Sequence, residues 1–110
     1  MDTKKGNAMA TSAEDPKRYS TIINEALATV QERGATYADP ATNHFRIAQL
    51  WSAYLERAIE PSEVAMCMAL VKIARLMESP QHDDSYVDLV AYAAIAGELA
   101  LTDWEKHGYF

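Results

Sequence analysis

The fold is decided by residues 61–92, which read PSEVAMCMALVKIARLMESPQHDDSYVDLVAY. Residues 61–77 would form a helix that is apolar on almost every side, and Pro61 suits its first position. The helical pattern resumes at Asp84 after a short polar break at residues 78–83. Two helices joined by so short a connection pack side by side in opposite directions. The sequence therefore predicts an antiparallel helical hairpin.

Four charged side chains and a tyrosine stand out on this hairpin. Lys72 and Arg75 are three residues apart, so they share one side of the first helix. Asp84, Asp88 and Tyr92 follow at four-residue spacing and form one stripe on the second helix. One interpretation is structural, with interhelical salt bridges that hold the hairpin in register. The other is a ligand pocket, in which the cations bind phosphate and the carboxylates bind a divalent cation or a ribose.

Aspartate–proline pairs mark the starts of the preceding helices. A helix is predicted over residues 15–34, with Gly34 as a left-handed cap at its end. A second helix is predicted over residues 40–57. Together with the hairpin helices at residues 61–77 and about 84–106, the pattern indicates an all-α domain of four helices.

Composition agrees with one compact helical domain. The chain has 110 residues, of which 49% are hydrophobic, four are Gly and four are Pro. Residues 1–13 are polar and patternless, so we expect a flexible tail followed by a single domain over residues 14–110. The helix at residues 61–77 offers more apolar surface than three short helices can cover. A homodimer or a larger homo-oligomer is therefore predicted.

Charge and cysteine content exclude several classes of function. The net charge of −6 repels polymeric nucleic acid, and no run of Lys or Arg offsets it. No apolar run approaches the roughly 18–20 residues that span a bilayer, and the first residues lack a hydrophobic signal core. The single Cys67, expected to be a small buried residue, excludes a disulfide within the monomer. We expect a cytoplasmic protein whose partner is a small anionic ligand.

A second set of candidate ligand-binding residues lies before and along the helix at residues 40–57: Arg33, Tyr37, Asn43, Arg46 and Trp51. Asn43 and Arg46 share a helix face. Trp51 is the best aromatic side chain for stacking on a base, although its place on the apolar stripe favours burial in the core. The histidines His44, His82 and His107 have no metal-ligand spacing and are interpreted as surface residues.

Three segments resemble a family of small phage-encoded helical proteins that is often labelled MazG-like: ERGATYADPATNHFRIAQLW (residues 32–51), VKIAR (residues 71–75) and HDDSYVDLVAY (residues 82–92). The likeness covers about residues 30–98. It implies an all-α fold like that of the nucleotide pyrophosphohydrolases, usually a dimer or tetramer whose helices pair across subunits. Ala38 departs from the family pattern, in which glycine is expected.

MazG-type enzymes carry an acidic motif on each of two helices, and the two motifs together bind magnesium. This chain resembles them at Asp84 and Asp88, but Lys72 and Arg75 stand where the first acidic motif is expected. Two carboxylates can hold one magnesium ion with help from water and substrate phosphates, yet they are a small set for hydrolysing a triphosphate. Cations in place of acids favour direct binding of an anionic ligand.

Three functions therefore stay open. The preferred one is a phage protein that captures a nucleotide or nucleotide-derived molecule, such as a host immune signal, which would give it an anti-defence role. In that case the two cations meet phosphate, an aspartate meets the ribose, and Trp51 or Tyr37 meets the base. The second is a magnesium-dependent nucleoside triphosphate pyrophosphohydrolase with Asp84 and Asp88 as catalytic metal ligands. The third is a structural helical oligomer.

Overall fold

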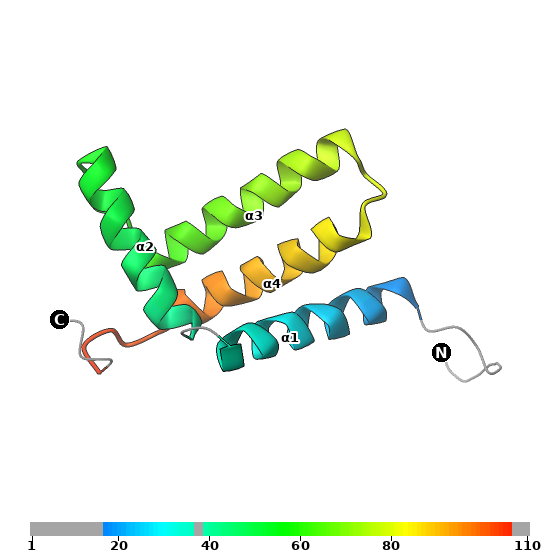
Figure 1. Cartoon of the computed structure of the whole chain (residues 1–110), viewed down its shortest axis with the longest axis horizontal. Helices are drawn as coiled ribbons and strands as arrows, with labels where there is room; N and C mark the ends of the chain where they lie inside the picture. Colours follow the sequence, from blue (N-terminus) through cyan, green and yellow to red (C-terminus); the bar gives the residue numbers. More distant parts are fainter. Residues whose placement is uncertain (1–16, 37–38, 107–110) are drawn as a thin grey trace.

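A computed structural model describes residues 17–36 and 39–106 of the chain (Figure 1). It contains four helices: α1 (Arg18–Thr36), α2 (Pro40–Leu55), α3 (Pro61–Glu78) and α4 (Asp83–Ala100). No strand occurs within these two described ranges, so the prediction of an all-α fold with four helices is confirmed. The predicted tail, the start of the first helix at residue 15, Tyr37, Ala38 and His107 lie outside the described residues.

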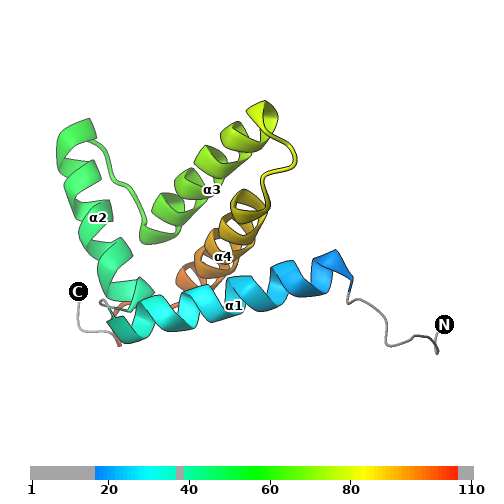
Figure 2. The same cartoon turned by 45° about the vertical axis from the view of Figure 1, so that its right-hand side comes forward.

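Helices α3 and α4 lie side by side in opposite directions, which confirms the predicted hairpin (Figures 1 and 2). Helix α1 packs along the other side of α4, so that α4 lies between α1 and α3. Helix α2 contacts the start of α3 and inclines away from the other three helices. The arrangement is therefore an open one, in which α2 touches the layer of α1, α4 and α3 near one end.

The starts of α2 and α3 are fixed by side-chain caps. The backbone N–H of Thr42 donates to Oδ1 of Asp39 at 2.9 Å, and Pro40 occupies the first helical position. At α3 the backbone N–H of Glu60 donates to Oε1 of Glu63 at 2.8 Å. These contacts satisfy polar groups that a helix start would otherwise leave unpaired.

The predicted end of the first helix was wrong. Helix α1 passes through Gly34 and continues to Thr36, so Gly34 is a helical residue and not a left-handed cap. A Cβ at Gly34 would meet nothing within 4 Å, which means that no close packing demands glycine there. Glycine costs a helix only about 1 kcal/mol, so it does not end one without a competing turn.

The last helix is shorter than predicted, because side chains after residue 100 form local hydrogen bonds. Oγ1 of Thr102 donates to the Glu98 carbonyl oxygen at 2.8 Å. Oδ1 of Asp103 then accepts from the backbone N–H of Glu105 at 3.2 Å. Such bonds offer the backbone an alternative to the helix. Trp104 folds back against Phe45 of α2, with the ring centroids 5.7 Å apart.

Two clusters of buried side chains form the core. The first joins α1 and α4 through Ala26, Val87 and Ala91. The second joins α3 and α4 through Ala65, Ala96 and Leu99, with Ala41 of α2 packed against it. Small side chains dominate both clusters, and this allows the helix backbones to approach closely. The core is therefore thin, and α4 contributes to both halves of it.

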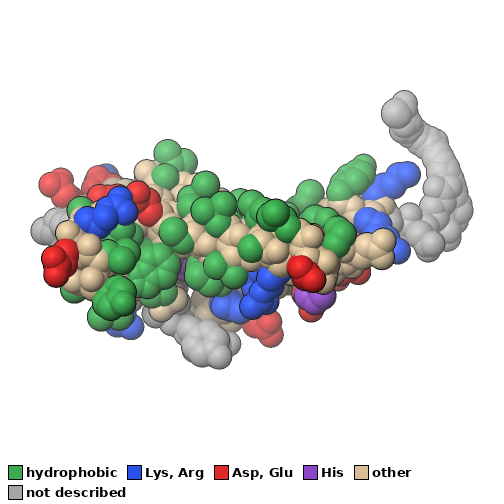
Figure 3. All heavy atoms as spheres, turned by 90° about the horizontal axis from the view of Figure 1, so that it is seen from above, with side chains coloured by type: hydrophobic (Ala, Val, Ile, Leu, Met, Phe, Trp, Pro, Cys, Tyr) green, Lys and Arg blue, Asp and Glu red, His purple; other side chains and the backbone are tan. Residues whose placement is uncertain are grey.

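One face of α3 is bare although its residues are apolar. Met66, Leu70, Ile73 and Met77 follow helical spacing, and between 41% and 82% of each residue is exposed. Figure 3, a view from above, shows hydrophobic side chains gathered along this face. Cys67 is also exposed, so the prediction of a buried cysteine was wrong. We call the four residues the α3 stripe. Within the described ranges, no helix is long and apolar enough to cross a bilayer.

Candidate ligand-binding site

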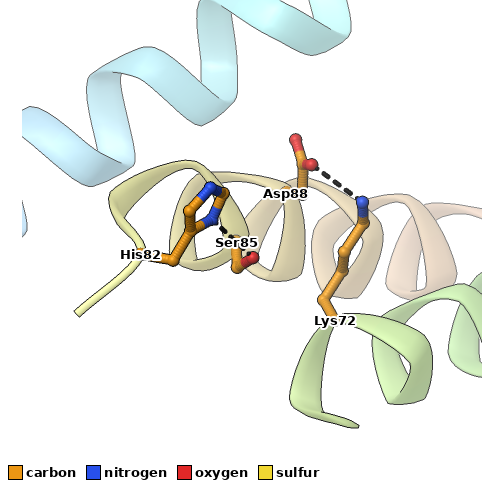
Figure 4. A network of polar contacts seen from close by, with 4 residues as sticks. All are labelled: Lys72, His82, Ser85 and Asp88. Atoms are coloured by element: carbon orange, nitrogen blue, oxygen red, sulfur yellow. Dashed lines mark hydrogen bonds and ion pairs between the residues drawn. The ribbon is translucent and has the colours of Figure 1, made fainter. Parts of the chain in front are cut away.

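One ion pair links the two helices of the hairpin. Nζ of Lys72 on α3 lies 3.0 Å from Oδ2 of Asp88 on α4 (Figure 4). The Lys72 side chain is 12% exposed and that of Asp88 is 33% exposed, so the pair is largely removed from water. The structural interpretation of the charged stripe is therefore confirmed for this pair.

The other two charged residues of the predicted set lie apart from this pair. Arg75 and Asp84 are both exposed, and neither forms an ion pair with another described residue. At the start of α4 the neighbouring Asp83 pairs instead with Arg18 of α1 at 3.9 Å, with side chains 76% and 87% exposed. So exposed a pair contributes little to stability.

A cavity of about 340 Å³ lies between α1, α2 and α4, and Met68 of α3 completes its wall. Its volume falls in the range of about 300–1,000 Å³ that is usual for small-molecule sites. Apolar side chains form much of its wall: Val30, Ile47, Met68, Ala91 and Ile95. Polar groups converge on it from three helices: Arg33, Asn43, His44, Asp88 and Tyr92.

The cavity unites residues from the two candidate sets. Arg33 and Asn43 come from the second set, and Asp88 and Tyr92 come from the hairpin stripe. Lys72 does not line the cavity, but it is one contact away through Asp88. We call Arg33, Asn43, His44, Asp88 and Tyr92 the cavity cluster.

Four further predicted site residues within residues 17–36 and 39–106 do not line the cavity. Arg46 is exposed on α2, and Trp51 is half-buried one and a half turns further along the helix. Neither of them, nor Arg75 or Asp84, belongs to the cavity wall. The cavity thus contains Arg33, Asn43, Asp88 and Tyr92 of the predicted site residues, and it does not contain Arg46, Trp51, Arg75 or Asp84.

His44 contradicts its interpretation as a surface residue. Only 6% of it is exposed, and its Nδ1 lies 2.8 Å from the Pro40 carbonyl oxygen. A carbonyl oxygen only accepts, so Nδ1 must carry the hydrogen. The sequence held a usable signal, because His44, Ile47, Ala48 and Trp51 follow one helical stripe. His44 belongs to the inner face of α2.

A second histidine contact is structural. Nδ1 of His82 lies 2.9 Å from Oγ of Ser85 at the start of α4 (Figure 4). Ser85 is 2% exposed, so its hydroxyl is closed to a substrate and the two residues are no hydrolytic dyad. His82 itself is exposed, as predicted. The contact lies across the first turn of α4, whose N-cap is His82.

The cavity cluster offers a single carboxylate, and that carboxylate is already paired. Asp88 is the one carboxylate among the described cavity residues, and the Lys72 ammonium occupies one of its oxygens. Residues 17–36 and 39–106 contain no group of three or more His, Cys, Asp or Glu side chains arranged to hold a metal ion. Magnesium is usually bound through one or two carboxylates together with waters and substrate phosphates. The arrangement suits a ligand held by an arginine, hydrogen bonds and apolar contact.

Comparison with known proteins places the chain in a phage-related family. Residues 21–100 match the family described as Domain of unknown function (DUF6378), so the chain belongs to that family. It is 42% identical over 78 residues to the Gene 55 protein of Mycobacterium phage L5, and 40% identical over 74 residues to the Gene 55 protein of Mycobacterium phage D29. These alignments cover 69% and 66% of the chain.

The chain spans about half the length of these two relatives, 49% in each case. No solved structure matches it. The resemblance to small phage proteins is thus confirmed, whereas the family and relatives carry no description of an activity.

Proposed function

We propose that this chain binds a nucleotide or nucleotide-derived anion in the cavity between α1, α2 and α4. The observation that carries the proposal is the composition of the cavity cluster. The exposed Arg33 and the buried His44 both line the cavity, together with apolar side chains. A nucleotide has the same division, with a charged phosphate at one end and a flat, weakly polar base at the other.

Each member of the cavity cluster has a role suited to its chemistry. The Arg33 guanidinium offers paired donors to phosphate oxygens. The Tyr92 ring offers a flat apolar surface for a base, and Asp88 accepts from a ribose hydroxyl. Lys72 is a positioning residue, because it holds the Asp88 carboxylate from the α3 side. Because the relatives are phage proteins, capture of a nucleotide-derived host immune signal would give this binding an anti-defence role.

Binding without magnesium is the first expected result. We expect at least one of four nucleotides, tested singly, to raise the melting temperature of the protein: AMP, GMP, CMP or UMP. The rise should be equal in EDTA and in magnesium chloride. A ligand present at 100 times its Kd adds about 2.7 kcal/mol of stability. Mass spectrometry of nucleoside triphosphates after incubation should show no conversion. Magnesium-dependent release of pyrophosphate that Asp88→Asn abolishes would instead establish the hydrolase.

Self-association through the α3 stripe is the second expected result. Four large apolar side chains without charges among them favour burial against a second copy. Light scattering should give a multiple of the 12.2 kDa chain mass at micromolar concentration. Leu70→Lys should lower that mass, whereas Gln31→Lys on the exposed side of α1 should not. A parent protein of single-chain mass would contradict this assignment.

A further inference from the structure

We infer that His44 holds the base end of the ligand, by accepting a hydrogen bond at Nε2 from a base N–H group. This inference rests on the proposed function and adds the orientation of the ligand to it. Three observations lead to it: the tautomer of the His44 ring, the lack of a partner for its second nitrogen, and its place in the cavity wall.

The tautomer follows from one contact. Nδ1 lies 2.8 Å from the Pro40 carbonyl oxygen, an atom that can only accept, so Nδ1 is the protonated nitrogen. In the neutral ring Nε2 then carries a lone pair and no hydrogen. The contact is made within the first turn of α2, whose start is fixed by Asp39 and Pro40. The ring therefore presents an acceptor, and its orientation is set by the helix start.

Nε2 has no hydrogen-bond or ion-pair partner among the described residues, although His44 is only 6% exposed. Buried polar groups are usually hydrogen-bonded, because burial without a partner costs free energy. His44 lines the cavity, so a bound molecule can supply the missing donor. The cavity residues Ile47, Met68 and Ala91 are apolar and cannot donate from their side chains.

The acceptor at Nε2 selects which end of a nucleotide it meets. A fully ionised phosphate has no hydrogen to donate, whereas bases carry exocyclic amino or ring N–H groups. The ribose hydroxyls also donate, but the proposed function already assigns them to Asp88. Arg33, by contrast, carries only donors, and it is the exposed cavity residue with a positive charge. The two residues therefore orient the ligand with its phosphate at Arg33 and its base at His44.

The first test needs no ligand. Nitrogen-15 NMR of the His44 ring in the free protein should show that Nδ1 is protonated and that Nε2 is unprotonated. Adding AMP, GMP, CMP and UMP in turn should shift the Nε2 resonance with whichever of them binds. A free protein with hydrogen on Nε2, whether neutral or doubly protonated, would overturn the inference and leave the proposed function standing.

The second test uses two variants whose side-chain amides each take the position of one nitrogen of the His44 ring. The amide of His44→Asn takes the place of Nδ1 and can still donate to Pro40, whereas the amide of His44→Gln reaches the position of Nε2. With the monophosphate that binds best, His44→Asn should weaken binding about tenfold, and His44→Gln should retain most of it. The melting temperature of the ligand-free variants shows whether each remains folded.

The last comparison separates the two ends of the ligand. His44→Asn should weaken the monophosphate and its nucleoside by the same factor, whereas Arg33→Ala should weaken only the monophosphate. If His44→Asn binds the monophosphate as the parent does and Arg33→Ala loses binding, the inference about His44 is refuted and the proposed function stands. If the parent bound none of the four monophosphates, the proposed function and this inference would both fall.

Discussion

Asp88→Asn is expected to destabilise the protein by about 1–3 kcal/mol, between the effect of breaking an exposed pair and that of breaking a fully buried one. The substitution keeps the shape of the side chain but removes the charge opposite Lys72. Nζ of Lys72 is 3.0 Å from Oδ2 of Asp88 and its side chain is 12% exposed, so an ammonium group with little access to water loses its counter-charge. Urea unfolding of the ligand-free protein, at one fixed concentration, measures the loss.

A substitution of the other partner of the ion pair is the matched control. Lys72→Met keeps the apolar part of the side chain but removes the ion-pair partner of the Asp88 carboxylate. The Asp88 side chain is 33% exposed, so water can solvate it. We expect a cost of about 0–1 kcal/mol, as for an exposed pair. The double variant should recover much of what Asp88→Asn loses, because no unpaired charge remains. A Lys72→Met cost equal to or above that of Asp88→Asn would show that the difference in burial does not govern this pair.

Helix starts were predictable because their chemistry is local. Asp39, Pro40 and Pro61 act within one turn, and α2 and α3 begin where these residues place them. Helix ends depend on which hydrogen bonds compete. No competing turn forms at Gly34, so α1 continues to Thr36. At the other end of the chain, the side chains of Thr102 and its neighbours form hydrogen bonds with backbone groups, and the helix ends early. That competition is settled by geometry that residue type alone does not specify.

The site was predictable in part, for a similar reason. Antiparallel pairing of α3 and α4 fixes the register, and the spacing of the charges was enough to bring Lys72 and Asp88 together. Residues nearer the tip of the hairpin, Arg75 and Asp84, remain exposed. Whether Arg33 or Arg46 reaches a cavity depends on how α1 packs on α4 and how α2 packs on α3, which no local pattern encodes. His44 is buried because it shares a helix face with Ile47 and Ala48, and the lack of metal-ligand spacing does not bear on its exposure.

The choice among arginines gives the prediction with the largest effect on ligand binding. Arg33→Ala should weaken the best-binding nucleoside monophosphate by about 10–100-fold, the equivalent of one charge-assisted hydrogen-bonded contact to phosphate. Arg46→Ala and Arg75→Ala are matched controls, because each removes an exposed helical arginine that does not line the cavity. Both should bind as the parent does. Calorimetric titration of the three variants against the same nucleotide measures the contrast.

Salt provides an independent measurement of the same contact. The attraction between exposed charges is screened over about 10 Å at 0.1 M ionic strength, so the parent should lose affinity as sodium chloride is raised. Arg33→Ala should lose less, because the screened contact is already gone. The nucleoside, which has no phosphate, should bind the parent with nearly the same affinity throughout the salt series. If Arg75→Ala and not Arg33→Ala removes the salt dependence, the phosphate lies at the hairpin tip and the cavity between α1, α2 and α4 is not the site.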